Sequence, residues 1–332
     1  MLRAIGGCLA LLACSGAPDV VARTHDDYDP TRPPHVLTLS GDVLAHDPSV
    51  IEADGRVFLF YTASGIGTKA SDDLITFRDQ PSVFSERPSW IAERVPDVGD
   101  LWSPDISYFD GSYHLYYAAS TFGSDRSCIG LATSLSLGAA ALWQDRGAVI
   151  CSNVNGSVDD FNAIDPELVL DDAGKPYLAF GSFNSGLELV ALDDSGLHTV
   201  GTPVSIAARP QNDNAVQAAS IWKRGAYYYL FSSFDLCCAG VDSTHRLMVG
   251  RSSKLNGPYV DRSGVALLEG GGTLVLESGE RWRGPGSNTI FYRDGRAYNV
   301  YHAYDADDDG KAKLRIAELA WDAMGWPVSG GP

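Results

Sequence analysis

The sequence predicts an all-β fold, a five-bladed β-propeller with four-stranded antiparallel blades around a central channel. Two observations support this prediction. Five times a turn glycine is followed, two residues later, by an eight-residue strand rich in aromatic residues, and the repeats show no helical periodicity. A unit of this kind cannot bury both of its faces alone, so it must stack on its neighbours. A sandwich of two sheets is the alternative, but it does not predict five like units.

Each repeat contains the same elements in the same order. The turn glycines are Gly55, Gly111, Gly174, Gly225 and Gly295. The aromatic strands that follow them read "VFLFYTAS", "YHLYYAAS", "PYLAFGSF", "YYYLFSSF" and "AYNVYHAY", and shorter strands such as "PSVIEA" and "ASIWK" precede them. Third strands follow most of them, as in "IGLATS", and fourth strands follow in places, as in "RGAVI". We expect "HVLTLS" at 35–40 to pair into the last blade and close the ring.

The chain begins with a pattern that is typical of export. Residues 1–14 carry a positive charge, an apolar run and small residues, which predicts a signal sequence and not a membrane span. "LLAC" ending at Cys14 also resembles a lipobox, so Cys14 is a candidate lipid anchor; a plain signal cleaved near Ala17 is the alternative. Residues 15–34 are interpreted as a flexible tether, and 35–332 as the propeller domain. We therefore expect a cell-surface or outer-membrane lipoprotein, or a secreted protein.

The net charge of −17 excludes one class of partner. A nucleic acid needs a basic face for its phosphates, and this chain is strongly acidic. An acidic surface suits a neutral substrate. It does not decide the chemistry.

Export makes disulfides feasible. "SCIGLATS" and "GAVICS" both read as strands of one hairpin, which places Cys128 opposite Cys151 and predicts a bridge between them. Cys237 and Cys238 are adjacent, and the sequence leaves open whether they form a vicinal disulfide or remain two thiols. A zinc site is not expected, because no further Cys or His pair has ligand spacing.

Counting back from the turn glycines gives one position per repeat. Eight residues before each glycine stand Asp47, Ser103, Pro166, Gln217 and Ser287, and one extra residue in the turn "DDAG" shifts the third position to Asp165. We expect these positions to begin the innermost strands at the mouth of the channel, so that they point toward one pocket. Two acids across a pocket suit glycoside hydrolysis, in which one carboxylate activates water while a carboxylic acid protonates the leaving oxygen.

Several blocks of the sequence resemble glycoside hydrolase family 43, and within it the endo-1,5-α-L-arabinanases. They are "HDPSV" (46–50), "LWSPDISY" (101–108), "NAIDPELVLDDAGKPYLAFGSF" (162–183), "YYYLFSSFDLCCAG" (227–240) and "YHAYDADDDG" (301–310). The resemblance spans about residues 40–330. It implies a five-bladed propeller that hydrolyses α-1,5-linked arabinan by single-displacement inversion, and hence arabinan or arabino-oligosaccharides as partners of what we expect to be a monomer.

The resemblance also assigns roles. Asp47 matches the general base and Asp165 the residue that tunes the proton donor's pKa. The donor itself belongs to a pattern like "EAP", and this chain has "QAA" there, so Gln217 occupies the place of the acid. A primary amide cannot protonate a departing alkoxide, because its N–H is far too weakly acidic. Activity is therefore expected to be low or absent, unless Glu167 or Asp213 supplies the proton.

Further site residues follow from the same resemblance. We expect substrate contacts from His46, Trp102, Asn162 and Ser185, although Trp102 could equally pack between blades. The family usually has "GPGHN", whose histidine helps to hold a metal ion, often calcium, in the central channel. This chain has Ser287 in that place, which leaves a calcium cofactor open.

Three functions remain after these assignments. The first is an exported arabinan-degrading glycosidase. The second is a propeller that binds arabinan without turnover. The third is a related furanosidase or xylosidase.

Overall fold

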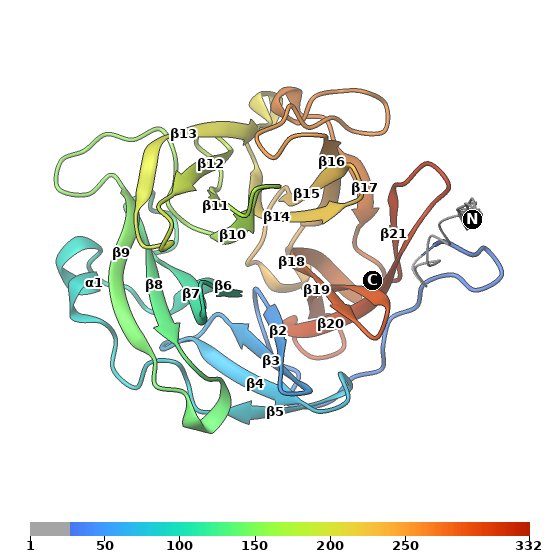
Figure 1. The fold of residues 1–332 in the computed structure, drawn as a ribbon. Helices are drawn as coiled ribbons and strands as arrows, with labels where there is room; N and C mark the ends of the chain where they lie inside the picture. Colours follow the sequence, from blue (N-terminus) through green and yellow to red (C-terminus); the bar gives the residue numbers. More distant parts are fainter. Residues whose placement is uncertain (1–26) are drawn as a thin grey trace, which may run out of the picture.

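The computed structural model describes residues 27–332 and shows five sheets in a ring (Figure 1). The predicted five-bladed propeller is confirmed. In each blade the first long strand in the sequence lies innermost, and the later strands follow outward in order. The predicted signal, Cys14 and most of the predicted tether lie outside the described residues. Among those that are described, no helix has the length and apolar character that a membrane crossing needs.

Each blade is built from consecutive strands of the chain. Blade I consists of β1 (Ser40–Gly41), β2 (Ser49–Ala53), β3 (Arg56–Tyr61), β4 (Gly67–Ser71) and β5 (Thr76–Gln80). Blade II consists of β6 (Leu101–Phe109), β7 (Ser112–Ala119), β8 (Ser127–Ser134) and β9 (Gln144–Ser152). Blade III consists of β10 (Glu167–Leu170), β11 (Pro176–Phe180), β12 (Leu187–Leu192) and β13 (Thr199–Ala207). Blade IV consists of β14 (Val216–Arg224), β15 (Tyr227–Phe234), β16 (Arg246–Ser252) and β17 (Thr273–Leu276). Blade V consists of β18 (Trp282–Arg293), β19 (Arg296–Asp305), β20 (Lys311–Trp321) and β21 (Pro327–Ser329).

Within residues 27–332, helical structure is confined to short segments between strands. The α-helix α1 spans Ser89–Arg94, between blades I and II. The 3₁₀ turns are η1 (Gly138–Ala140), η2 (Pro210–Asn212), η3 (Gly240–Asp242) and η4 (Leu267–Glu269).

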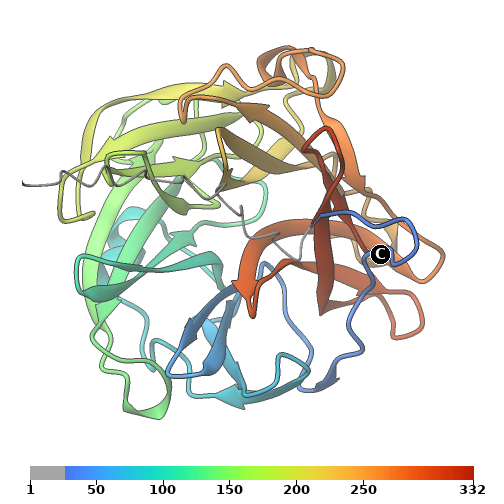
Figure 2. The same ribbon diagram turned by 45° about the vertical axis from the view of Figure 1, so that its right-hand side comes forward.

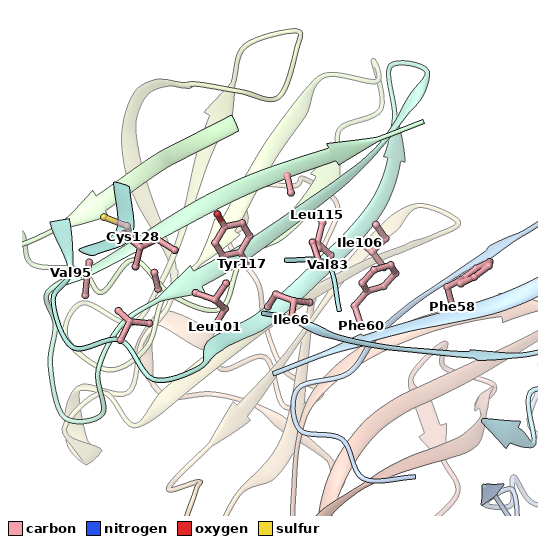
Figure 3. Close-up of a cluster of buried hydrophobic side chains, with 14 of the residues drawn as sticks. Phe58, Phe60, Ile66, Val83, Val95, Leu101, Ile106, Leu115, Tyr117 and Cys128 are labelled. Atoms are coloured by element: carbon pink, nitrogen blue, oxygen red, sulfur yellow. The ribbon is translucent and has the colours of Figure 1, made fainter. Parts of the chain in front are cut away.

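The strand pattern builds the core between the blades rather than within one sheet. Side chains alternate along a strand, so each sheet presents one apolar face to each neighbouring blade. In blade I, Phe58 and Phe60 of β3 belong to one cluster with Leu115 and Tyr117 of β7, as Figure 3 shows. The alternate residues of β3 belong to a different cluster with blade V. Further clusters join each of the remaining pairs of adjacent blades.

The ring is closed by the segment before blade I, as predicted. The N–H of Leu37 donates to the carbonyl of Ile316 on β20 at 2.8 Å, and the N–H of Glu318 donates to the carbonyl of His35 at 2.9 Å. This segment then enters β1, which pairs in parallel with β5. In Figure 2 the blue segment accordingly runs beside the red strands of blade V. Blade I therefore has a fifth, two-residue strand that the four-stranded prediction did not include.

Both pairs of cysteines in the propeller are bridged. Cys128 on β8 stands opposite Cys151 on β9, and the predicted disulfide between them is present. Cys237 and Cys238 form a vicinal disulfide, which resolves the alternative that the sequence left open.

Inner strands are also joined by polar side chains at the axis. Ser49, Asp105 and Glu167 stand at matching positions of blades I, II and III, and each accepts the N–H of a residue in the next blade. The donors are Ile106 at 3.1 Å, Leu168 at 2.9 Å and Ile221 at 2.8 Å. Neighbouring blades are therefore linked by hydrogen bonds as well as by apolar contacts.

The Asp105 link makes stability depend on pH. Burial raises the pKa of Asp105 to about 7, against the opposing hydrogen bonds from Leu168, Ser107 and Ser49. Between the ordinary aspartate pKa and this value the folded chain holds a proton that the unfolded chain has released, so the free energy of unfolding falls as pH rises through that interval. Asp105→Asn keeps an oxygen acceptor for Leu168 and cannot ionise. Between about pH 5 and about pH 8, the free energy of unfolding should fall by roughly 1–2 kcal/mol less in this variant than in the unmodified protein, as measured by chemical unfolding.

The exposed Asp100 provides the matched control. Asp100→Asn should lose as much stability as the unmodified protein over the same interval. Equal losses in all three proteins would contradict the assignment to Asp105.

Candidate active site

In each blade one residue just before or within the inner strand lies in the left-handed region of backbone conformation. These residues are Asp47 (φ 50°), Ser103 (φ 46°), Asp165 (φ 54°), Ala218 (φ 55°) and Ser287 (φ 50°). All five line one cavity at the axis. Non-glycine residues rarely adopt this conformation, and such positions cluster at functional sites. The five repeats therefore do converge, as the sequence predicted, with one change in blade IV.

The change is that Ala218, and not Gln217, takes the repeated position. In blades I, II and V the glycine is the second residue of a two-residue turn, as in Asp54–Gly55. In blade IV the pair Arg224–Tyr227 encloses Gly225 as the first turn residue. A count that starts from the glycine is therefore one residue out of register in that blade. The prediction that Gln217 is the blade IV equivalent of Asp47 and Asp165 was wrong.

Gln217 instead matches the residues directly before the left-handed position. It pairs with Ser233 ahead of a register shift, as Trp102 pairs with Ala118 and Gly286 with His302. Its equivalent in blade I is His46. The Oε1 atom of Gln217 accepts a hydrogen bond from the Ser182 hydroxyl at 3.1 Å, which joins blades III and IV.

Asp47 lies among hydrogen-bond donors and is only 12% exposed. Its Oδ2 atom accepts from the Thr62 hydroxyl and lies against Nδ1 of His46, both at 2.7 Å. Burial by itself would raise the pKa of Asp47, but the charge of His46 and these hydrogen bonds outweigh it and hold the pKa well below its usual range. Asp47 is therefore ionised at neutral pH, as a general base must be.

A continuous set of contacts leads from Asp47 to blade IV. The hydroxyl of Thr62 donates to Asp47 and accepts the N–H of Ser103 at 3.0 Å. The Ser103 side chain donates to Asp165, which also accepts the backbone N–H of Ala218. The structure thus brings together the two acids, and places Gln217 one residue from the group that binds Asp165.

The two acids differ in protonation. Burial and the negative charge of Asp47 together raise the pKa of Asp165 to about 7, against the hydrogen bond from Ser103 and the charge of His46. Two carboxyl groups whose pKa values are pushed apart in this way suit acid–base chemistry, in which one must be ionised and the other able to hold a proton.

His46 connects the base to blade V. Its ring stacks on His302 with the centroids 3.8 Å apart, and its Nε2 atom lies 2.7 Å from the Tyr304 hydroxyl. Burial lowers the pKa of His46, but the charge of Asp47 and the hydrogen bond to it raise the pKa by more. His302 is fully buried, and its Nδ1 atom accepts the backbone N–H of Asp47 at 3.1 Å.

This part of the site does not fit a calcium ion. Among the described residues His46, Asp47 and His302 are the group whose potential ligand atoms lie within 4.8 Å of one another. Calcium takes six to eight oxygen ligands, whereas this group offers two imidazoles and one carboxylate. Both imidazoles already contact Asp47 through Nδ1. Ser287 offers only a hydroxyl where the resemblance expects a histidine.

The other predicted site residues lie within three positions along the chain of Ser103, Asp165 and Ser182. Trp102 is half-buried at the start of β6. Asn162 is buried and its Oδ1 atom accepts from the Ser127 hydroxyl, while the Ser185 hydroxyl donates to Glu188. Their proposed contacts with substrate stay predictions.

In the described part of the chain, the two alternative proton donors make no direct contact with the two acids, although Glu167 lines the same cavity. Both carboxylate oxygens of Glu167 lie within 3.0 Å of the backbone nitrogen of Ile221, so this group is engaged in the contact between blades III and IV. Asp213 is exposed and follows η2. Neither is among the groups that contact Asp47 or Asp165 in the described residues.

Thr62 and Tyr304 are site residues that the sequence did not indicate. Thr62 directly follows the aromatic strand β3, and Tyr304 stands two residues after His302 on β19, hence on the same face. Period-two spacing from a histidine was the signal for Tyr304. Its partner His46 is 258 residues away, and no local pattern reveals that contact.

A five-bladed propeller with two acids lining one cavity at its axis is an architecture suited to glycoside hydrolysis. The model of the Glycosyl hydrolases family 43 matches residues 41–327, and the chain belongs to this family.

Individual relatives agree with this assignment. An extracellular endo-α-(1→5)-L-arabinanase of Bacillus subtilis is 44% identical over 86% of this chain and 87% of its own. An extracellular exo-α-(1→5)-L-arabinofuranosidase of Cellvibrio japonicus is 37% identical over 85% of each chain. A solved endo-arabinanase of family 43 from Bacillus licheniformis superposes with a TM-score of 0.83 at 43% identity, covering 88% of this chain and 99% of that one.

Proposed function

We propose that this protein is an exported glycoside hydrolase that acts on α-1,5-linked arabinan by inversion, with a proton-donor position occupied by Gln217. The observation that carries the proposal is the contact path from Asp47 through Thr62 and Ser103 to Asp165. Support for arabinan as the substrate comes from two relatives named as an endo-α-(1→5)-L-arabinanase and an exo-α-(1→5)-L-arabinofuranosidase, and from a solved structure of an endo-arabinanase.

The chemistry follows from the protonation states. Asp47, held ionised, removes a proton from a water molecule, and the oxygen of that water attacks the anomeric carbon on the face opposite the leaving group. The bond to the leaving oxygen breaks, and that oxygen must gain a proton. Asp165 contacts the backbone beside Gln217 and orients that end of the site.

Gln217 limits the second half of this reaction. Its amide can donate a hydrogen bond to the leaving oxygen but cannot release a proton to it. Departure of an alkoxide without protonation is slow, and general acid catalysis typically contributes about 10²–10⁴-fold. We therefore expect slow turnover of natural arabinan.

The same observation favours a second function, that of an arabinan-binding propeller without turnover. The two acids and the groups that connect them are in place, so binding would survive the loss of chemistry. Export fits both functions and agrees with the extracellular relatives. Attachment through Cys14 and a monomeric state stay predictions, whereas the residues around Asp47 do not fit the calcium ion that the resemblance left open.

Release of reducing ends from debranched arabinan separates the two functions. Measurable release that disappears in the absence of the protein would support the hydrolase. Calorimetric binding of arabino-oligosaccharides with no product after prolonged incubation would support the binding protein. If the protein neither binds arabino-oligosaccharides nor releases reducing ends, both functions are contradicted.

A further inference from the structure

A chain of short contacts connects the predicted base to a surface loop. Nδ1 of His46 lies 2.7 Å from Oδ2 of Asp47, and Nε2 of the same ring lies 2.7 Å from the hydroxyl of Tyr304. Tyr304 is 4% exposed and so is held almost entirely by protein groups. Its hydroxyl also accepts the backbone N–H of Cys238 at 2.9 Å.

The loop that supplies this N–H is constrained by the vicinal disulfide. The bridge between Cys237 and Cys238 closes a short ring around their peptide bond, which restricts the direction of the Cys238 N–H. The loop continues into η3 and is fastened by the Ala239 N–H, which donates to the Ser243 hydroxyl at 3.0 Å. Cys238 itself is exposed, although the hydroxyl it binds is buried.

These contacts decide which oxygen of Asp47 is available. Both Thr62 and His46 contact Oδ2 at 2.7 Å, whereas Oδ1 lies 3.5 Å from Nδ1 of His302, a nitrogen that already accepts the Asp47 N–H. Oδ1 is therefore the oxygen better able to take a proton from water. An imidazole bound at one nitrogen alone can tilt and rotate. A partner at Nε2 fixes the ring, and thereby the orientation of the carboxylate on Nδ1.

We propose that Tyr304 is a positioning residue for the base Asp47, acting through His46, and that the Cys237–Cys238 disulfide holds Tyr304 in place. This inference rests on the proposed function, in which Asp47 activates water. It extends the site from the axis to a bridged loop of blade IV.

The first test is Tyr304→Phe, made in the Gln217→Glu protein so that turnover is measurable. The variant removes one oxygen and keeps the ring. We expect kcat on arabino-oligosaccharides to fall about tenfold or more while KM stays within about twofold, because the base is misaligned but the sugar contacts remain. Tyr298→Phe, the same change on the same strand β19, is the matched control and should leave both constants unchanged.

The second test removes the bridge. Cys237→Ala/Cys238→Ala should lower kcat in the same direction as Tyr304→Phe, with KM unchanged, and combining the two changes should add little further loss. Kinetic constants of Tyr304→Phe equal to those of Tyr298→Phe would overturn the role of Tyr304. An unaffected double-cysteine variant would overturn the role of the disulfide.

A spectroscopic readout makes the inference independent of turnover. The imidazole ¹⁵N signals of His46, assigned by their loss in His46→Asn, should shift in Tyr304→Phe and in the double-cysteine variant but not in Tyr298→Phe. If no form of the protein hydrolyses arabinan, the proposed function fails while these signals still report on the contact. Unchanged His46 signals in Tyr304→Phe would overturn the inference whatever the activity.

Discussion

Replacing Gln217 with glutamate is expected to raise the rate of arabinan hydrolysis by about 10²–10⁴-fold, the usual contribution of a general acid. The substitution changes an amide nitrogen to an oxygen and adds no volume. The Ser182 hydroxyl that donates to Gln217 Oε1 can donate equally to a carboxyl oxygen. Gln217 is half-buried near the start of β14 and directly precedes Ala218, whose N–H donates to Asp165.

The leaving group provides the sharpest control for this expectation. In an aryl α-L-arabinofuranoside the leaving group is a weakly basic phenolate, which can depart without being protonated. Gln217→Glu should therefore accelerate hydrolysis of this substrate far less than hydrolysis of arabinan. Gln217→Ala, which removes the side chain without supplying a proton, should not accelerate either substrate. Initial rates for both substrates with all three proteins give the comparison. An equal gain on both substrates, or no gain on arabinan, would contradict the role assigned to this position.

The fold was predictable because its signals are local. An Asp–Gly pair between two strands, as at Asp54–Gly55, specifies a tight hairpin, and alternating apolar residues such as Phe58 and Phe60 specify a sheet with two covered faces. Five copies of this strand–turn–strand pattern are compatible with few architectures. The closure by residues 35–40 followed because a ring of blades needs a strand that joins its ends.

The site was predictable only in part, because its register depends on a turn. Placing Gly225 first in its turn instead of second moves the repeated position from Gln217 to Ala218, and a sequence count cannot detect this shift. A local sequence pattern also cannot predict contacts between blades. Thr62 links Asp47 to Ser103 across two blades, and nothing in the sequence around Thr62 distinguishes it from an ordinary strand end.

Asp47→Asn, made in the Gln217→Glu protein so that the starting rate is high, is expected to lower kcat on arabinan by roughly 10²–10⁴-fold. KM should change little. Asparagine can still accept a hydrogen bond from Thr62, so the backbone at this left-handed position and the fold should be preserved. Its amide cannot take a proton from water. Asp213→Asn, a change at an exposed site in the loop before β14, should leave the rate unchanged.

The same variant has a second effect, on the protonation of Asp165. The negative charge of Asp47 is one of the two causes that raise the pKa of Asp165 to about 7, the larger being burial. Removing that charge should lower the pKa of Asp165 toward the ordinary aspartate range while leaving it above that range, since burial remains. A carboxyl ¹³C titration of Asp165 in both proteins measures this shift. An unmoved Asp165 together with an unchanged kcat would show that the two acids do not act on one sugar, and the assignment of Asp47 as the base would then be wrong.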